Sequence, residues 1–232
     1  MPEEINRLLT DQIGDLLFTP SLDADAHLAR EGIVAGKIHR VGNTMIDTLL
    51  EHLATARRSG ALERLGLKPR GYALLTLHRP SNVDDAGSLR SLMGAMGELA
   101  AVKPVLFPAH PRTRKRLAEF GIESPQGVRL MEPLGYLEFL ALTDSAAAVL
   151  TDSGGLQEET TVLGVPCLTL RENTERPVTV EIGTNELVGL DPERIVERGQ
   201  KALRGEWKRG RVPELWDGKA AERIADVIEK QA

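Results

Sequence analysis

The segment LTDSGGLQEE, residues 150–159, carries the side chains best suited to binding chemistry. An apolar run leads into the Ser-Gly-Gly turn at residues 153–155, and a helical pattern follows at once. Free N–H groups and the positive end of the helix dipole attract anions, and the glycines let a diphosphate approach the backbone. Ser153 adds a hydroxyl donor, and Glu158 or Glu159 suits two adjacent ribose hydroxyls. The alternative is a plain helix start that Ser153 caps and the acids favour electrostatically.

Two histidines follow other predicted strands. The segment TLHRPSN brings His78 and Arg79 to the end of one strand, and FPAHPRTRKR brings His110 to the end of another. Carboxyl ends of parallel strands share one edge of a sheet, so we expect His78 near Ser153. A histidine there can contact a phosphate or sugar beside a permanently charged arginine. A His-Arg pair with only local hydrogen bonds is the alternative, and the basic residues after His110 are typical of a solvated helix face.

An arginine, a glutamate and a cysteine elsewhere in the chain are further candidates for functional or core positions. The segment RENTERP follows the last predicted strand and either offers Arg176 to a diphosphate or forms a polar loop. Glu3 suits the first turn of a helix electrostatically. The single cysteine, Cys167, is interpreted as a small core residue. The five histidines lack the spacing of metal ligands, so no metal site is predicted.

These residues must be positioned by alternating strands and helices between about residues 72 and 190. Short apolar runs without polar alternation are typical of strands buried on both faces. The predicted strands cover residues 72–77, 105–108, 128–131, 147–150 and 165–170, the last closing the series; the predicted helices include 89–99, 136–142, 156–163 and one opened by Pro111. The pattern predicts an α/β fold: a doubly wound, Rossmann-like parallel sheet with helices on both sides.

The first 42 residues follow another pattern. A helix over 2–13, the segment DLLFTP, a helix over 22–30 and the strand IHRVG provide two strands, too few for an independent parallel sheet. We therefore expect residues 1–42 to be the tail of an N-terminal Rossmann-like domain with uncovered, association-prone apolar faces. Residues 43–205, beginning with Asn43 as a helix cap, form the complete nucleotide-binding domain, and residues 206–232 a helical segment packing back across the boundary.

Composition excludes several protein classes. With 41% hydrophobic and 27% charged residues, the 232-residue chain can bury a core and remain soluble. No apolar run reaches the roughly 20 residues of a membrane helix, and the N-terminus lacks the layout of a signal peptide. The 29 basic and 34 acidic residues give a net charge of −5, which argues against a general nucleic-acid surface. We expect a cytoplasmic enzyme or ligand-binding domain with neither membrane nor nucleic acid as partner.

Taken together, these segments resemble one enzyme family, the non-hydrolysing UDP-N-acetylglucosamine 2-epimerases. The resemblance runs through MPEEINR, HRVGNTMIDTLL, TLHRPSNVDD, FPAHPRTR, LTDSGGLQEE and RENTERPVTVEIGTN. It implies two Rossmann-like domains arranged as in GT-B glycosyltransferases, with the active site in the cleft between them. It also implies interconversion of UDP-GlcNAc and UDP-ManNAc through elimination and re-addition of UDP, with no cofactor and no metal.

The resemblance assigns roles residue by residue. Glu3 matches an acid/base carboxylate, and His78 would contact the diphosphate and assist departure of UDP. The substrate-binding positions are Ser153, Gly154 and Gly155 for phosphate, Glu159 for the ribose, Arg176 for the diphosphate or sugar, and Leu134 and Phe139 for the uracil through backbone groups. Arg79 and His110 match positions near an activator site for a second UDP-GlcNAc, and members of the family are commonly homodimers.

Two departures from the family pattern stand out. Ser81 occupies the position where the family motif HR-x-E-N usually has glutamate. The chain also begins at MPEE, truncated relative to the family's N-terminal half, so with Met1 as the true start we expect UDP binding without robust epimerisation. Two alternatives stay open: a GT-B glycosyltransferase lobe, against which the QEE and TERP combination argues, and a UDP-sugar-binding module without catalysis.

Overall fold

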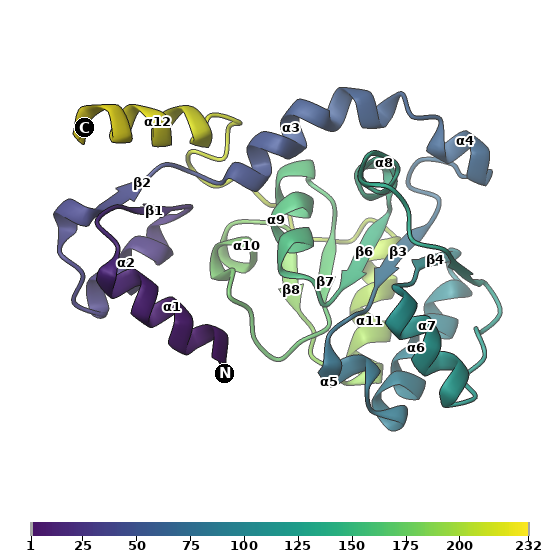
Figure 1. Ribbon diagram of the computed structural model, residues 1–232. Coiled ribbons are helices and arrows are strands. Elements are labelled where there is room, and N and C mark those ends of the chain that lie inside the picture. Colours follow the sequence, from purple (N-terminus) through teal and green to yellow (C-terminus); the bar gives the residue numbers. More distant parts are fainter. Residues whose placement is uncertain (1, 232) are drawn as a thin grey trace. The chain divides into compact units, whose positions relative to one another are not determined.

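The computed structural model of this protein describes residues 2–231, with side chains from residue 4 onward (Figure 1). The chain divides into two compact units, one formed by Met1–Glu51 with Pro213–Ala232 and the other by His52–Val212. The boundary between these units at Glu51 and His52 falls within helix α3 (Thr44–Arg57). The domain boundaries expected at residues 42 and 205 stay predictions. Among the described helices, none is long and apolar enough to cross a membrane.

The second unit is built on six parallel strands. Their order is β5-β4-β3-β6-β7-β8, which is the doubly wound Rossmann order and reverses between β3 and β6. The strands are β3 (Ala73–Thr76), β4 (Val105–Pro108), β5 (Val128–Met131), β6 (Ala148–Thr151), β7 (Cys167–Thr169) and β8 (Asn185–Leu187). The predicted α/β class is confirmed. The series does not close at residue 170, however, because the edge strand β8 extends it.

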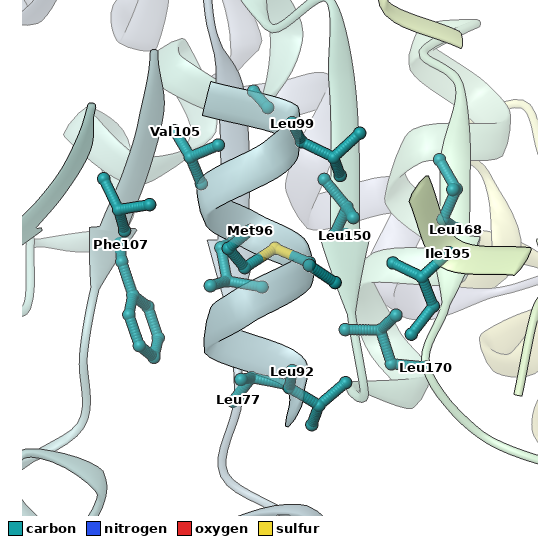
Figure 2. Packing of buried hydrophobic residues seen from close by; sticks show 14 of the residues in the cluster. Leu77, Leu92, Met96, Leu99, Val105, Phe107, Leu150, Leu168, Leu170 and Ile195 are labelled. Carbon is teal, nitrogen blue, oxygen red and sulfur yellow. The ribbon is translucent and has the colours of Figure 1, made fainter. Parts of the chain in front are cut away.

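Both faces of this sheet are covered, which explains the unbroken apolar runs. Alternate strand residues, such as Leu75 and Leu150, pack on one side against α6 (Ala86–Ala100), α7 (Pro111–Glu119) and α11 (Pro192–Leu203). Their neighbours Leu74 and Val149 pack on the other side beneath α4 (Ala61–Leu65), α8 (Tyr136–Ser145) and α9 (Gly154–Leu163). Figure 2 shows the α6 side, where Met96 lies among the aliphatic side chains of the sheet. The sheet is therefore rigid, and its strand ends hold the loops in fixed positions.

The first unit contains a single β-α-β piece. Strands β1 (Leu17–Thr19) and β2 (Ile38–Arg40) pair in parallel, and α1 (Pro2–Ile13), α2 (Leu22–Arg30) and the short turn η1 (Ala35–Lys37) accompany them. On α1, Ile5, Leu9 and Ile13 are 61%, 62% and 80% exposed. The expectation of uncovered apolar surface is confirmed at these three residues, while their tendency to associate stays a prediction.

The C-terminal helix α12 (Ala220–Gln231) belongs to the first unit. Asp47 accepts hydrogen bonds from the backbone N–H groups of Ala220 at 3.1 Å and Ala221 at 2.8 Å, which caps the helix. Gly42 adopts a φ of +95°, and a Cβ there would overlap the carbonyl oxygen of Leu215. Only glycine permits that approach of two backbones, which explains the glycine in HRVG.

Candidate functional site

The candidate site lies where the strand order reverses, at the ends of β3 and β6. Thr76 and Thr151 are register partners in the last paired position, and their hydroxyls lie 2.7 Å apart. The two strands therefore end at the same level, and the chain leaves them in opposite directions, into α5 (Pro80–Val83) and α9. Ligands of open α/β sheets bind at such a point. The structure brings His78 and Ser153 to this shared edge, as the sequence predicts.

Asp152 occupies the centre of the edge and is completely buried. Its Oδ2 accepts hydrogen bonds from the N–H groups of His78 at 3.0 Å and Arg79 at 2.9 Å, and from Nδ2 of Asn82 at 3.1 Å. Its Oδ1 lies 2.8 Å from Nδ1 of His78. A buried carboxylate requires such a complete set of partners. Asp152 is not among the site residues predicted from the sequence, although its place between a buried strand and the Ser-Gly-Gly turn was a usable signal.

The turn at residues 153–155 does not use the Ser153 hydroxyl as a helix cap. Ser153 is the N-cap residue of α9, yet its hydroxyl makes no capping hydrogen bond within the described residues. Its backbone N–H donates to Oγ1 of Thr151 at 2.9 Å. A Cβ built on Gly154 would meet no described atom within 4 Å beyond its own turn. Ser153 therefore lacks the hydrogen bond that would support its interpretation as a simple helix cap. The start of the helix keeps room for an anion.

The two glutamates of α9 have different environments. Glu158 has a side chain 3% exposed, and its Oε1 lies 2.8 Å from Nε of Arg176 in an ion pair. Glu159 is also buried, and that burial together with the charge of Glu158 raises the pKa of Glu159 to about 7. Arg176 is therefore partly neutralised before any ligand binds. Of the two acids, Glu159 is the one not held by Arg176.

Gln157 connects the Ser153 turn to the loop that carries Arg176. It is fully buried; its Nε2 donates to the carbonyl of Ser153 at 3.1 Å, and its Oε1 accepts from Thr174 Oγ1 at 2.6 Å and Asn185 Nδ2 at 3.0 Å. Thr174 Oγ1 in turn accepts the N–H of Arg176 at 2.9 Å. Sequence reasoning missed Gln157 and Asn185, because nothing in a helical or strand pattern indicates these partners.

Replacing Gln157 with leucine is expected to lower the free energy of unfolding of the second unit by about 1–2 kcal/mol, because Oγ1 of Thr174 and Nδ2 of Asn185 each lose an acceptor. Urea unfolding followed by tryptophan fluorescence in a Trp216→Phe background measures this, because Trp207, whose Nε1 donates to the carbonyl of Thr184, is then the one tryptophan of the chain. Gln126→Leu, at an exposed position, is the control and should shift stability by less than about 0.5 kcal/mol. Equal effects of both substitutions would contradict the linking role of Gln157.

His110 and the basic residues after it lie at the end of β4. His110 is exposed and caps α7, its Nδ1 accepting from the N–H of Arg112 at 3.2 Å. Arg112 pairs with Asp84, and Arg114 lies 2.9 Å from Glu132. These pairs agree with a solvated helix face. The activator role of His110 stays a prediction.

The polar loop after β7 supplies the acid nearest to Arg79. Arg79 Nη2 lies 3.8 Å from Oε1 of Glu175, which also accepts from Arg171 at 2.6 Å. The hydrogen bonds from Arg171 lower the pKa of Glu175 to about 2. Glu175 therefore balances both arginines at this edge, and the activator role of Arg79 stays a prediction.

Leu134 and Phe139 both pack against the hydrophobic cluster beneath α8. The N–H of Phe139 donates to the carbonyl of Gly135 at 2.9 Å, and its carbonyl accepts from Thr143 Oγ1 at 2.9 Å. These backbone groups are engaged inside α8, so the donors that the helix start offers are the N–H groups of residues 136–138. The uracil contact therefore stays a prediction.

The remaining predictions from the sequence concern Glu3, Cys167 and metal binding. Glu3 lies in α1, and its side chain falls outside those described. Cys167 is buried in β7, where burial raises the pKa of its thiol to about 11, so its interpretation as a core residue is confirmed. No group of three or more His, Cys, Asp or Glu side chains suited to a metal ion occurs in the described part of the chain.

Comparison with known proteins identifies the family. The family model described as UDP-N-acetylglucosamine 2-epimerase matches residues 1–229. The UDP-N-acetylglucosamine 2-epimerase of Methanocaldococcus jannaschii is 44% identical, over 98% of this chain and 64% of its own length. The UDP-2,3-diacetamido-2,3-dideoxy-D-glucuronate 2-epimerase of Pseudomonas aeruginosa is 41% identical, over 99% of this chain and 64% of its own.

A solved structure agrees with these relatives. The crystal structure of the M. jannaschii UDP-GlcNAc 2-epimerase in complex with UDP-GlcNAc and UDP matches with a TM-score of 0.89 at 43% identity, covering 99% of this chain and 65% of that one. The chain thus spans slightly less than two thirds of the length of these relatives. Because the family model matches nearly every residue, the chain belongs to the UDP-N-acetylglucosamine 2-epimerase family.

Proposed function

We propose that this chain binds the UDP moiety of a UDP-sugar and takes part in the interconversion of UDP-GlcNAc and UDP-ManNAc at carbon 2. The observation that carries the proposal is the start of α9 at the strand-order reversal, with Gly154 open and Glu159 one turn further on. Membership of the epimerase family supports the same ligand class.

Each part of UDP has a partner of matching chemistry. The diphosphate binds the N–H groups of Gly154 and Gly155 and the hydroxyl of Ser153, where the helix dipole favours negative charge. Glu159, once ionised, accepts hydrogen bonds from the ribose hydroxyls. Leu134, Phe139 and the first turn of α8 border the uracil. Arg176, held by Glu158, contacts the diphosphate or the sugar.

The reaction breaks the C2–H bond and the bond between C1 and the diphosphate oxygen, and it forms a C1–C2 double bond. A base takes the C2 proton, and UDP leaves with the electron pair of the broken C1–O bond. Negative charge develops on the departing diphosphate, which His78 and the start of α9 stabilise. Re-addition of UDP with a proton on the opposite face of C2 gives the epimer. Glu3 is the carboxylate proposed for acid/base work, and the reaction uses no cofactor.

The rest of the proposal follows from the family resemblance. A second UDP-GlcNAc binds as activator near Arg79 and His110, the protein is a homodimer, and it works in the cytoplasm. The residues proposed to hold UDP all lie in the described chain. UDP binding is therefore the part of the proposal that can be measured on this chain alone.

A second candidate substrate is UDP-2,3-diacetamido-2,3-dideoxy-D-glucuronate. It is favoured by the 41% identity to the P. aeruginosa enzyme named for that sugar. Ser81, exposed on α5, also favours it, because the glutamate usual at this position would repel the carboxylate of a uronate. The reaction at carbon 2 is the same for both sugars.

Incubation of the protein with either UDP-sugar in D2O tests the reaction. Deuterium is expected at C2 of both the recovered substrate and its epimer, as measured by NMR and mass spectrometry. Epimer formed without deuterium would contradict removal of the C2 proton. Release of UDP only when a sugar acceptor is added would indicate the glycosyltransferase alternative. UDP binding without turnover is expected of a truncated epimerase, and it would indicate the binding module only if a protein extended to the length of the relatives also failed to turn over either sugar.

A further inference from the structure

The two oxygens of the buried Asp152 carboxylate have different tasks. Oδ2 accepts from three N–H donors: the backbone groups of His78 at 3.0 Å and Arg79 at 2.9 Å, and Nδ2 of Asn82 at 3.1 Å. Oδ1 lies 2.8 Å from Nδ1 of His78 and only 3.2 Å from the backbone nitrogen of the same residue. Oδ2 therefore makes most of the hydrogen bonds that fix the loop after β3. Oδ1 shares the N–H of His78 and is the oxygen that faces the imidazole ring.

An ionised carboxylate is an acceptor only, so the short contact requires a proton on Nδ1 of His78. A neutral imidazole carries one ring proton, which leaves its Nε2 without one. The His78 side chain is 48% exposed although Asp152 is completely buried, so the ring is held at one end and open at the other. We propose that Asp152 is a positioning residue that locks His78 in the Nδ1–H tautomer and presents Nε2 to the ligand.

This inference rests on the proposed function, which puts His78 at the departing diphosphate. An anionic oxygen needs a hydrogen on Nε2 as donor, and since Nδ1 also keeps its proton, the bound ring is an imidazolium. Asp152 balances that charge. The other cations of this edge, Arg79 and Arg171, share Glu175 instead. A charged donor holds a diphosphate more strongly than a neutral one.

The substitution Asp152→Asn separates the two tasks. A carboxamide has one acceptor oxygen, and three donors converge on the position of Oδ2. The carbonyl oxygen is therefore expected to stay there, and the NH2 group takes the place of Oδ1. That group donates to Nδ1 of His78, so the ring must carry its proton on Nε2. The loop keeps its three hydrogen bonds to the position of Oδ2 and loses only the longer one from the N–H of His78 to Oδ1, while the tautomer reverses.

Long-range 1H–15N correlation spectra of the 15N-labelled full chain, recorded where the ring is neutral, test this. The signals of His78 are assigned by their loss in His78→Gln. We expect Nδ1–H in the unchanged protein and Nε2–H in Asp152→Asn. The control Thr76→Val, an isosteric change two residues before His78, should keep Nδ1–H. A proton on Nε2 in the unchanged protein would overturn the inference, and this measurement does not depend on any variant folding. A tautomer that does not change in folded Asp152→Asn would also overturn it.

UDP titration keeps this inference distinct from the proposed function. We expect UDP affinity to fall about 3- to 10-fold in Asp152→Asn, because the donor to the anionic diphosphate changes from an imidazolium to a neutral imidazole, while uridine affinity is unchanged. If the unchanged protein has the expected tautomer and binds no UDP, the proposed function fails while the tautomer assignment holds. If UDP binds and the tautomer does not reverse, Asp152 loses its positioning role while the proposed function holds.

Discussion

Replacing Gly154 with alanine is expected to weaken UDP binding by roughly 10- to 100-fold without lowering the stability of the fold. The added methyl group meets no described protein atom within 4 Å beyond its own turn, so the protein accommodates it. It projects instead into the space where the diphosphate approaches the first N–H groups of α9. Loss of one charged hydrogen bond costs about 1.5–3 kcal/mol, which corresponds to that range of affinity.

Titration calorimetry with UDP measures the affinity, and thermal unfolding measures the stability. The matched control is Gly94→Ala, because Gly94 is an exposed glycine in the middle of α6 with equally free surroundings. That control should gain up to about 1 kcal/mol of stability from helix propensity and leave UDP affinity unchanged. Equal UDP affinity in Gly154→Ala and the unchanged protein would remove the diphosphate from the start of α9.

Replacing Glu159 with glutamine is expected to stabilise the second unit at pH 8 and to have little effect near pH 5. Burial and the charge of Glu158 raise the pKa of Glu159 from its ordinary value near 4.5 to about 7. Between these two values the folded protein keeps a proton that the unfolded chain has lost. Stability therefore falls as pH rises through this window, by at most about 3 kcal/mol, and glutamine removes the loss.

Thermal and urea unfolding of both proteins at pH 5 and pH 8 measure this difference. The same variant should bind UDP more weakly, because a neutral amide is a poorer acceptor for the ribose hydroxyls than a carboxylate. Glu158→Gln provides the opposite control, since breaking the ion pair with Arg176 is expected to destabilise the protein. A stability difference between Glu159→Gln and the unchanged protein that did not vary with pH would contradict the titration of Glu159.

Two features of the candidate site are expected to lower the stability of the fold. A carboxylate buried next to a second one, and a helix start whose serine makes no capping bond among the described residues, are unfavourable for folding alone. The proposed ribose and diphosphate would supply partners for both features. The cost of the site is thus itself an argument for a ligand.

The sequence predicted the central strands well because burial on both faces leaves a strong signal. Val105–Pro108 and Val128–Met131 match their expected ranges residue by residue. The edge strand Asn185–Leu187 was missed, since it contains a buried asparagine that is hydrogen-bonded to Thr169 and Gln157 rather than packed as an apolar residue. Apolar patterning cannot detect a polar side chain that is buried because its partners are distant in sequence.

The same limit applies to the candidate site. His78 and Ser153 could be brought to one edge because each follows a recognisable strand. Asp152 and Gln157 could not be assigned, because their roles depend on partners such as His78 and Asn185 that are far away along the chain. The strand order makes β3 and β6 neighbours. It arises from the packing of the whole unit and cannot be predicted from any one segment of the sequence.

We propose that the diphosphate of UDP binds at the start of α9, between the ends of β3 and β6. It is tested most directly by titrating the 15N-labelled chain with UDP and, separately, with uridine. Saturable shifts of the amide signals of Gly154 and Gly155 are expected with UDP and only small ones with uridine, which lacks the phosphates. Absence of a saturable shift at these two glycines, or equal shifts with both ligands, would contradict the account.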